Sequence, residues 1–332
     1  MKHRQWRVFR TRRFIVRIAT LLFAEMGLVA HLASAQSNQL AHDVFLLKVT
    51  KAEHQATLMT WPEEYRDSRI VRSFDIALGK ESGDKQAIGD NRTPEGIYFT
   101  QAHIHGRLLP KKYGALAIPI NYPNPMDKVS QKTGFGIWLH GVERDGRVAE
   151  KSVTEGCVAF HNQDIDLLQH WLPAYQALVV IGEKDEDINR PEDLVDVQAN
   201  VHGWLKAWQS RDVEAYGNFY AENFAHEKGR TRASYKMYKK LVFDSYTDMR
   251  VSMSNIRIVT HPKYAVAVMQ QEFQGDKRFH VSGRKVLYWQ RDTSGKWKIS
   301  REIFDEKPFL PHAYDHERLA SISAHLSSKN QL

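Results

Sequence analysis

The sequence predicts two domains, a mainly-β domain over residues 36–182 and an α+β domain over residues 194–310. From Val44 onward, short runs rich in β-branched and aromatic residues alternate with turn-forming segments, which is typical of strands. Residues 183–193 are dense in charged side chains and include a proline, which predicts a solvated linker. Beyond this linker, three helical patterns precede four long strand patterns, the order expected of an α+β domain.

In the first domain, strand patterns dominate and only one segment has helical periodicity. Strands are expected at residues 44–49, 55–61, 70–78, 97–100, 134–140 and 177–181. Residues 162–172 place apolar side chains on one face of a helix. Residues 118–125 are rich in proline and asparagine, so we expect an ordered loop that borders a functional site rather than a central strand.

In the second domain, the hydrophobic period changes from that of helices to that of strands. Helices are expected at residues 194–210, 212–220 and 231–240, and strands at 249–259, 264–273, 279–291 and 297–304. Residues 292–295 form a turn between the last two strands. Residues 311–332 are expected to form a C-terminal tail.

The first 35 residues have the composition of an export signal. A basic segment precedes a mostly apolar run from Phe14 to Leu32, which ends in Ala33-Ser34-Ala35. We therefore expect cleavage after Ala35 and a periplasmic mature protein. A retained N-terminal anchor is the alternative, and no other segment approaches the length of a membrane helix.

The basic charge of the chain lies mainly in this N-terminal segment. The formal net charge is +8, but residues 1–35 hold seven of the 47 Lys and Arg residues and one of the 39 acidic residues. The remaining chain is nearly neutral. A nucleic-acid partner is therefore not expected, because such proteins present a basic surface.

Cys157 is the only cysteine in 332 residues, so it cannot form an internal disulfide. Gly156 precedes it and permits a tight turn that exposes the thiol. His140 ends an apolar strand pattern upstream, from which an imidazole can reach the sulfur. A free thiol has a pKa near about 8.5, so a neighbouring histidine is needed to form the thiolate at neutral pH. The pattern favours a nucleophile over a buried, inert cysteine.

These residues resemble the L,D-transpeptidase catalytic domain, also called the YkuD family. That family has a histidine followed by a Ser/Thr-x-Gly-Cys motif, with an asparagine shortly after it. The matching residues here are His140-Gly141, Thr154-Glu155-Gly156-Cys157 and Asn162. Residues 92–98, Arg-Thr-Pro-Glu-Gly-Ile-Tyr, match a second family segment. Ala159 departs from the pattern, because many family members have an arginine two residues after the cysteine.

The resemblance implies an enzyme that acts on peptidoglycan stem tetrapeptides containing meso-diaminopimelate through a thioester on Cys157. His140 would act as base and acid, a carbonyl near Gly141 would orient the imidazole, and N–H groups of Gly156 and Cys157 would stabilise the oxyanion. The thioester would pass to an amine in an L,D-transpeptidase or to water in an L,D-carboxypeptidase, and the sequence does not choose between them. No cofactor or metal is needed.

Substrate contacts are expected from Thr154, Glu155 and Asn162 of these motifs, and from Tyr122 of the loop 118–125. Tyr122 is equally compatible with a place in the core, and Glu155 with a solvated position.

Three other histidines need an interpretation. His103 and His105 have the alternate spacing of some metal ligands, but without a clear third ligand we interpret them as surface or substrate-facing residues. His161 is a weaker alternative to His140 as the base.

The second domain resembles the NTF2-like, or SnoaL-like, family, whose openings are similar to residues 204–216 here. That family implies a cone-shaped domain with a curved sheet around a pocket. The pairing of the two domains resembles the cell-shape L,D-carboxypeptidases of helical bacteria. Two alternatives remain: a non-catalytic glycan- or peptide-binding protein that uses the NTF2-like pocket, and an NTF2-like isomerase or cyclase. The sequence also leaves a homodimer open.

Overall fold

The computed structural model describes residues 44–63, 68–307 and 309. The predicted export signal, the start of the first domain and the predicted C-terminal tail lie outside these residues. The first domain is rich in strands, as predicted. Its strands are β1 (Phe45–Thr50), β2 (Gln55–Thr60), β3 (Ile70–Gly79), β4 (Gly96–Phe99), β5 (Ile104–His105), β6 (Leu116–Pro119), β7 (Trp138–His140), β8 (Ser152–Thr154), β9 (Val158–Phe160) and β10 (Leu178–Gly182).

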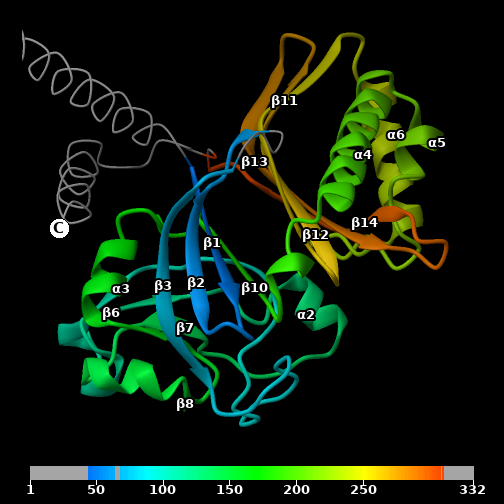
Figure 1. Ribbon diagram of the computed structural model, residues 1–332. Helices are drawn as coiled ribbons and strands as arrows, with labels where there is room; N and C mark the ends of the chain where they lie inside the picture. Colours follow the sequence, from blue (N-terminus) through cyan, green and yellow to red (C-terminus); the bar gives the residue numbers. More distant parts are fainter. Residues whose placement is uncertain (1–43, 64–67, 308, 310–332) are drawn as a thin grey trace, which may run out of the picture. The chain divides into compact units, whose positions relative to one another are not determined.

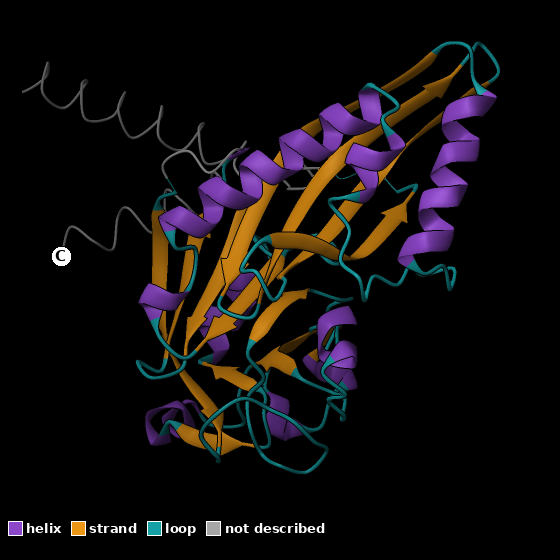
Figure 2. Cartoon of the chain, turned by 90° about the vertical axis from the view of Figure 1, so that its right-hand side faces the viewer, coloured by secondary structure: helices purple, strands orange, loops and turns teal. Residues whose placement is uncertain are grey.

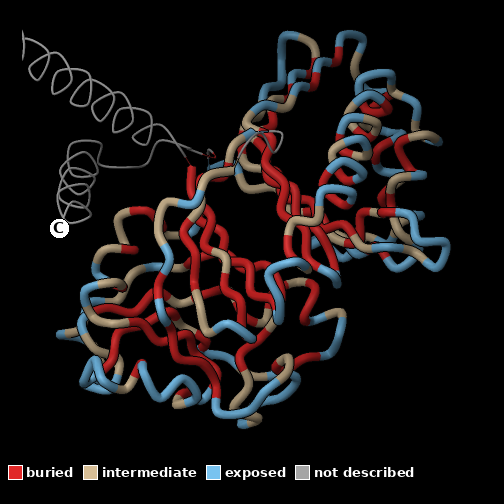
Figure 3. The backbone as a smooth tube through the Cα atoms, in the orientation of Figure 1, coloured by how far each residue is buried: buried red, intermediate tan, exposed pale blue. Residues whose placement is uncertain are grey.

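These strands form one mixed sheet with the order β4-β10-β1-β2-β3-β9-β7-β6-β5, and β8 pairs with β3 (Figure 1). The helices of this domain are short: α2 (Pro125–Val129), α3 (Asn162–Leu168) and the 3-10 turns η2 (Gly106–Leu108), η3 (Lys111–Tyr113), η4 (Asp145–Glu150) and η5 (Asp185–Asp187). Burial follows the strands, while most connecting loops are exposed (Figure 3). The important adjacency is that of β7 and β9, which run parallel and end beside each other.

The second domain has the predicted order of helices followed by strands. Its elements are α4 (Pro191–Gln209), α5 (Val213–Gly217), α6 (Arg232–Ser245), β11 (Met249–His261), β12 (Tyr264–Gly275), β13 (Phe279–Arg291) and β14 (Trp297–Asp305). The strands form an antiparallel meander in chain order. Figures 1 and 2 show the helices on one side of this sheet. Asp212 and Thr231 cap α5 and α6 by accepting N–H hydrogen bonds from the first turn.

The sheet of the second domain is buried on both faces. Because side chains alternate along a strand, Ala265, Ala267 and Met269 of β12 pack against the helices. Val266 and Val268 point the other way and join a second core with β1, β4 and β10 of the first domain. The two domains therefore share a hydrophobic core.

Polar contacts at this shared core are specific. The hydroxyl of Tyr264 accepts hydrogen bonds from the Ile97 N–H and the Asn124 side chain, each at 2.6 Å. Lys263 pairs with Asp84 at 2.7 Å and with Glu95 at 3.0 Å. The turn between β11 and β12 is thus joined to the loops that follow β3 and precede β4.

Several predicted boundaries were wrong. The predicted strand 134–140 is ordered as a strand only from Trp138, because Gly134 and Gly136 adopt positive φ angles of 105° and 72°. The predicted loop 118–125 begins with the end of β6, a strand flanked by β5 and β7. Pro119 is accommodated there because β5 has already ended, so its missing N–H costs no ladder bond on that side.

The predicted linker is also shorter than residues 183–193. Helix α4 begins at Pro191, since proline is well tolerated at the first position of a helix. Asp193, expected to be solvated, is 1% exposed and pairs with Arg190 and Arg291.

Candidate active site

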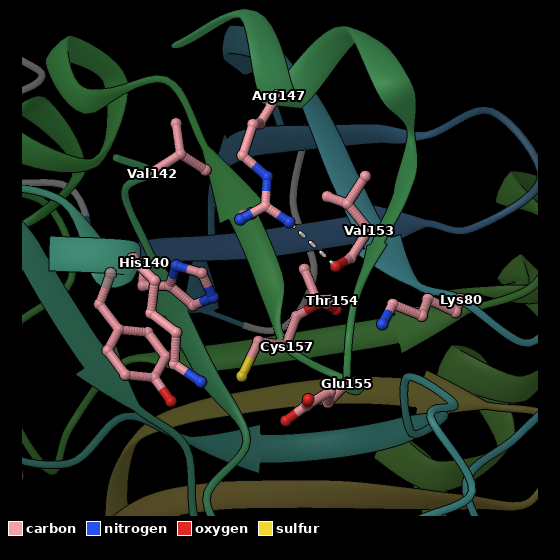
Figure 4. Close-up of a pocket in the computed structure, with 11 residues that line it drawn as sticks. Lys80, His140, Val142, Arg147, Val153, Thr154, Glu155 and Cys157 are labelled. Atoms are coloured by element: carbon pink, nitrogen blue, oxygen red, sulfur yellow. Dashed lines mark hydrogen bonds between the residues drawn. The ribbon is translucent and has the colours of Figure 1, made fainter. Parts of the chain in front are cut away.

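The parallel pairing of β7 and β9 brings the histidine and the cysteine together. His140 is the last residue of β7 and lies opposite Ala159 of β9, while Cys157 immediately precedes β9. Residues two apart on a strand point to the same face, so Cys157 and Ala159 share the side of His140. All three line one open cavity of about 610 Å³. Figure 4 shows the imidazole and the sulfur projecting into this cavity.

The turn before Cys157 is closed by Thr154. Its hydroxyl donates to the Cys157 carbonyl at 2.8 Å and accepts from the Gly156 N–H at 3.1 Å. The Gly156 N–H is therefore already used and does not point to an oxyanion, contrary to the expectation for that residue. Among the described residues, no hydrogen-bond acceptor for the Cys157 N–H is found, so this group is the donor left for an oxyanion.

Gly156 is instead required by packing. It has a φ angle of 123°, and a Cβ atom there would lie 2.6 Å from the carbonyl oxygen of Arg92. The neighbouring Thr93 accepts a hydrogen bond from the Gly79 N–H at 2.9 Å. The second motif of the sequence, residues 92–98, thus packs directly against the cysteine turn.

His140 is 5% exposed and held by two contacts. Its Nδ1 atom is hydrogen-bonded to the carbonyl of Gly141, which makes Nδ1 the donor and leaves Nε2 as an acceptor. The ring of Tyr113 packs edge-on against the imidazole with centroids 5.0 Å apart. These contacts fix the tautomer and the orientation of the imidazole.

Burial keeps both reactive groups neutral in the free protein. It lowers the pKa of His140 to about 4, with the positive charges of Lys112 and Arg147 acting in the same direction. It also raises the pKa of the Cys157 thiol to about 11. The expected thiolate–imidazolium pair is thus not the favoured resting state. The thiol makes a long hydrogen bond to the Gly136 carbonyl at 3.5 Å, and the backbone of Trp138 is a second hydrogen-bond partner.

The expected substrate-contacting residues fall into two groups. Thr154 and Glu155 line the cavity, although the Thr154 hydroxyl is engaged in the turn. Tyr122 lies outside it, because the side chain is buried and its hydroxyl donates to the Thr133 carbonyl at 3.0 Å. Asn162 also lies outside: it accepts from the Ala115 N–H at 3.0 Å and donates to the Val142 carbonyl at 2.7 Å, joining two loops.

His103, His105 and His161 do not line this cavity. His103 Nε2 contacts the carbonyl of Leu172 at 2.8 Å, and His105 is exposed. His161 precedes α3 and does not line the cavity. In the described part of the chain, no cluster of three metal-ligating side chains occurs.

Sequence reasoning missed the cationic wall of the cavity. Lys80, Lys112 and Arg147 line it together with Tyr113. Each comes from a turn or loop with no motif of its own. The only available signal was Ala159, whose small side chain leaves room for a cation from elsewhere.

Comparisons with known families agree with this geometry. Residues 45–184 match the model of the L,D-transpeptidase catalytic domain. These residues are therefore an L,D-transpeptidase, or YkuD, domain. Residues 196–303 match the Cds6 C-terminal NTF2-like domain, which confirms the predicted pair of domains.

Two solved structures resemble both domains together. Bd1075 of Bdellovibrio bacteriovorus is 27% identical with a TM-score of 0.69, and the match covers 81% of this chain and 94% of that one. Pgp2 of Campylobacter jejuni, a helical cell shape determining protein, is 26% identical with a TM-score of 0.63, covering 79% and 92%. A search of curated protein sequences found no match. No helix within the described ranges is both long and apolar enough to cross a membrane.

Proposed function

We propose that the protein is a peptidoglycan-modifying cysteine acyltransferase that acts on stem tetrapeptides containing meso-diaminopimelate. The observation that carries the proposal is the shared cavity of Cys157 and His140 within an L,D-transpeptidase domain. The likeness to a helical cell shape determining protein supports a role in shaping the cell wall. The basic and apolar N-terminus supports action in the periplasm.

The first step forms the thioester. The Nε2 atom of His140 takes the thiol proton as the Cys157 sulfur attacks the carbonyl carbon that follows the L-centre of diaminopimelate. The Cys157 N–H stabilises the negative oxygen of the tetrahedral intermediate, a contact typically worth about 10²–10³ in rate. The imidazolium then protonates the leaving amine, and the terminal D-amino acid departs.

The second step regenerates the thiol. Neutral His140 removes a proton from water or from an acceptor amine, which attacks the thioester carbonyl. Collapse of that intermediate releases the acyl group, and the sulfur recovers the proton from the imidazolium. With water as acceptor the product is a tripeptide, and the enzyme is an L,D-carboxypeptidase. With an amine as acceptor the product is a cross-linked or exchanged peptide, and the enzyme is an L,D-transpeptidase.

The products separate these two activities. Purified protein is incubated with tetrapeptide muropeptides, with and without a free D-amino acid, and the products are identified by mass spectrometry. A tripeptide indicates hydrolysis, and a cross-linked or D-amino-acid-exchanged peptide indicates transfer. An unchanged muropeptide profile, with the protein folded, would reject the proposal.

A second candidate function is muropeptide binding by the NTF2-like domain. This domain has a cavity of about 1120 Å³ lined by aromatic and charged side chains, among them Trp208, Lys239 and Glu302. Gln271 and Trp208 also line it, and the Gln271 Oε1 and Trp208 Nε1 atoms are buried without a hydrogen-bond partner. Unpaired buried polar atoms are unfavourable unless a ligand or water satisfies them.

This second function is testable in the full chain with Cys157→Ala, which removes turnover. Titration calorimetry with muropeptides should show binding that Lys239→Met weakens. Equal affinity with and without Lys239→Met would reject the NTF2-like cavity as the binding site.

A further inference from the structure

The cysteine cavity has an excess of positive charge. Three cationic residues line it, Lys80, Lys112 and Arg147, against one carboxylate, Glu155. Among the described residues, none of these three cations forms an ion pair. Several buried lysines elsewhere in the fold, such as Lys132 and Lys285, have a carboxylate partner within 3 Å. The cavity is therefore suited to an anionic ligand.

Arg147 is the best placed of the three. Lys80 and Lys112 are exposed, whereas Arg147 is half-buried and so less fully hydrated. Its guanidinium makes one long hydrogen bond, to the Val153 carbonyl at 3.4 Å. Most of its donors remain available. Figure 4 shows the guanidinium directed from η4 into the space between His140 and Thr154.

The element that supports Arg147 is fixed by packing. The next residue, Val148, is 2% exposed and joins a small core with Ala77, Val142 and Ala159. Ala159 is the position where many family members have an arginine, and here it only lines the wall. The guanidinium of Arg147 thus approaches the same cavity from a different strand connection. A planar guanidinium pairs with carboxylates in a bidentate manner.

We propose that Arg147 binds the C-terminal carboxylate of the stem peptide and thereby directs Cys157 to the last peptide bond. The inference rests on the proposed function, because that function places a D-amino acid with a free carboxylate one residue beyond the scissile carbonyl. A peptide whose chain continues past this residue lacks the carboxylate and is a poor substrate.

Three tetrapeptide substrates test the proposal. One has free carboxylates, one is amidated at the terminal D-amino acid, and one is amidated at the D-centre of diaminopimelate. Release of the terminal residue is measured for the wild type, Arg147→Met, Arg147→Lys and the control Arg144→Met. Arg144 is exposed on the same segment and does not line the cavity.

The wild type should lose about ten- to a hundred-fold in kcat/KM on the terminally amidated substrate. Arg147→Met should lose the same factor in kcat/KM on the substrate with free carboxylates. It should no longer distinguish this substrate from the terminally amidated one. Arg147→Lys should recover part of the preference, and Arg144→Met should retain all of it.

Two outcomes would overturn the role of Arg147 and leave the proposed function intact. Either Arg147→Met keeps the full preference for a free terminus, or it loses discrimination against the D-centre amide instead. A wild type that releases no terminal residue from any substrate would overturn the proposed function itself.

Discussion

His140 lies directly opposite Ala159 in the parallel pairing of β7 and β9, and this register places the imidazole over the turn that presents Cys157. The two strands are short, but both are flanked by others, β7 by β6 and β9 by β3. The site is thus built on the interior of a sheet rather than on mobile loops. Its rigid parts are the sulfur, the imidazole and the Cys157 N–H.

The resting protonation state predicts a distinctive reactivity of the thiol. Because burial raises the pKa of Cys157 to about 11, alkylation by iodoacetamide should be slow at pH 7. Its rate should rise about tenfold per pH unit up to pH 10, following the thiolate fraction. Cys157 is the only thiol, so total alkylation measured by intact mass reports it directly. A rate independent of pH between about 5 and 8 would instead indicate a preformed ion pair.

Lowering the pH should protonate His140 only well below the range of an ordinary histidine. Since the pKa of His140 is lowered to about 4, kcat/KM should fall as the pH decreases through that value, where Nε2 becomes protonated. An unperturbed histidine would give this fall near about 6.5. Rates at saturating and limiting substrate between pH 3.5 and 8, with circular dichroism as a folding control, make the distinction.

Gly156 should tolerate no side chain. Gly156→Ala adds a Cβ 2.6 Å from the Arg92 carbonyl at a positive φ, which should cost about 2 kcal/mol or more and displace the turn. Gly146→Ala is the matched control, since a Cβ there meets nothing within 4 Å. Urea unfolding measures both. Equal stability of the two variants would contradict the packing role assigned to Gly156.

The buried charges of the NTF2-like domain should matter greatly for stability. Glu302 accepts hydrogen bonds from Tyr220, Tyr235 and Lys285 at 2.6, 2.9 and 2.6 Å. Removal of the carboxylate by Glu302→Ala leaves Lys285 buried and unpaired, which should cost about 3–5 kcal/mol. Glu306→Ala, at an exposed position, should change the free energy of unfolding by less than about 0.5 kcal/mol.

The same carboxylate gives a pH dependence with a definite sign. Burial acts to raise the pKa of Glu302, but Lys285 and Lys239 outweigh it and hold the pKa below its ordinary value. Its stabilising contribution is therefore present above the ordinary value and is lost as the pH falls below it. The difference between wild type and Glu302→Ala should shrink in acid. A constant difference down to pH 3 would contradict this linkage.

The contact between the domains should depend on Lys263. Lys263→Met removes its pairs with Asp84 and Glu95, yet Asp84 keeps Lys132 and Glu95 keeps Lys51. We therefore expect a modest loss of about 1 kcal/mol, recovered in part by Lys263→Arg. Lys277→Met, at an exposed turn, is the control. If Lys263→Met and Lys277→Met both unfold at the wild-type temperature, the ion pairs of Lys263 contribute nothing to stability.

Much of the fold was accessible from sequence because strands and helices leave local periodic patterns. The strands β1, β2, β3 and β10 and all elements of the second domain were predicted within a few residues. The pairing of β7 with β9 was not, because parallel neighbours are set by contacts between distant segments. Two predictions that relied on proline were wrong. Pro119 ends a paired strand rather than lying in a loop, and Pro191 starts a helix rather than lying in a linker.

Only those residues of the candidate site that stand in a sequence motif could be predicted. Cys157, His140 and Gly156 stand in a spaced motif, and the cavity brings the first two together. Tyr122 was expected near substrate because of its place in the loop 118–125, and Asn162 because of its place in the motif, yet their polar groups hold loops in place. Arg147 stands in no motif, and a single arginine in a polar turn resembles any solvated charge; Ala159 indicated only that a cation could come from elsewhere.

The role of Cys157 as the nucleophile is tested by the release of the terminal D-amino acid from tetrapeptide muropeptides. Wild type and Cys157→Ala are compared at equal concentration, with circular dichroism confirming that both are folded. We expect Cys157→Ala to lower the rate by at least about 10³-fold, because this substitution removes the sulfur on which the acyl intermediate forms. Release by folded Cys157→Ala at the wild-type rate would contradict it.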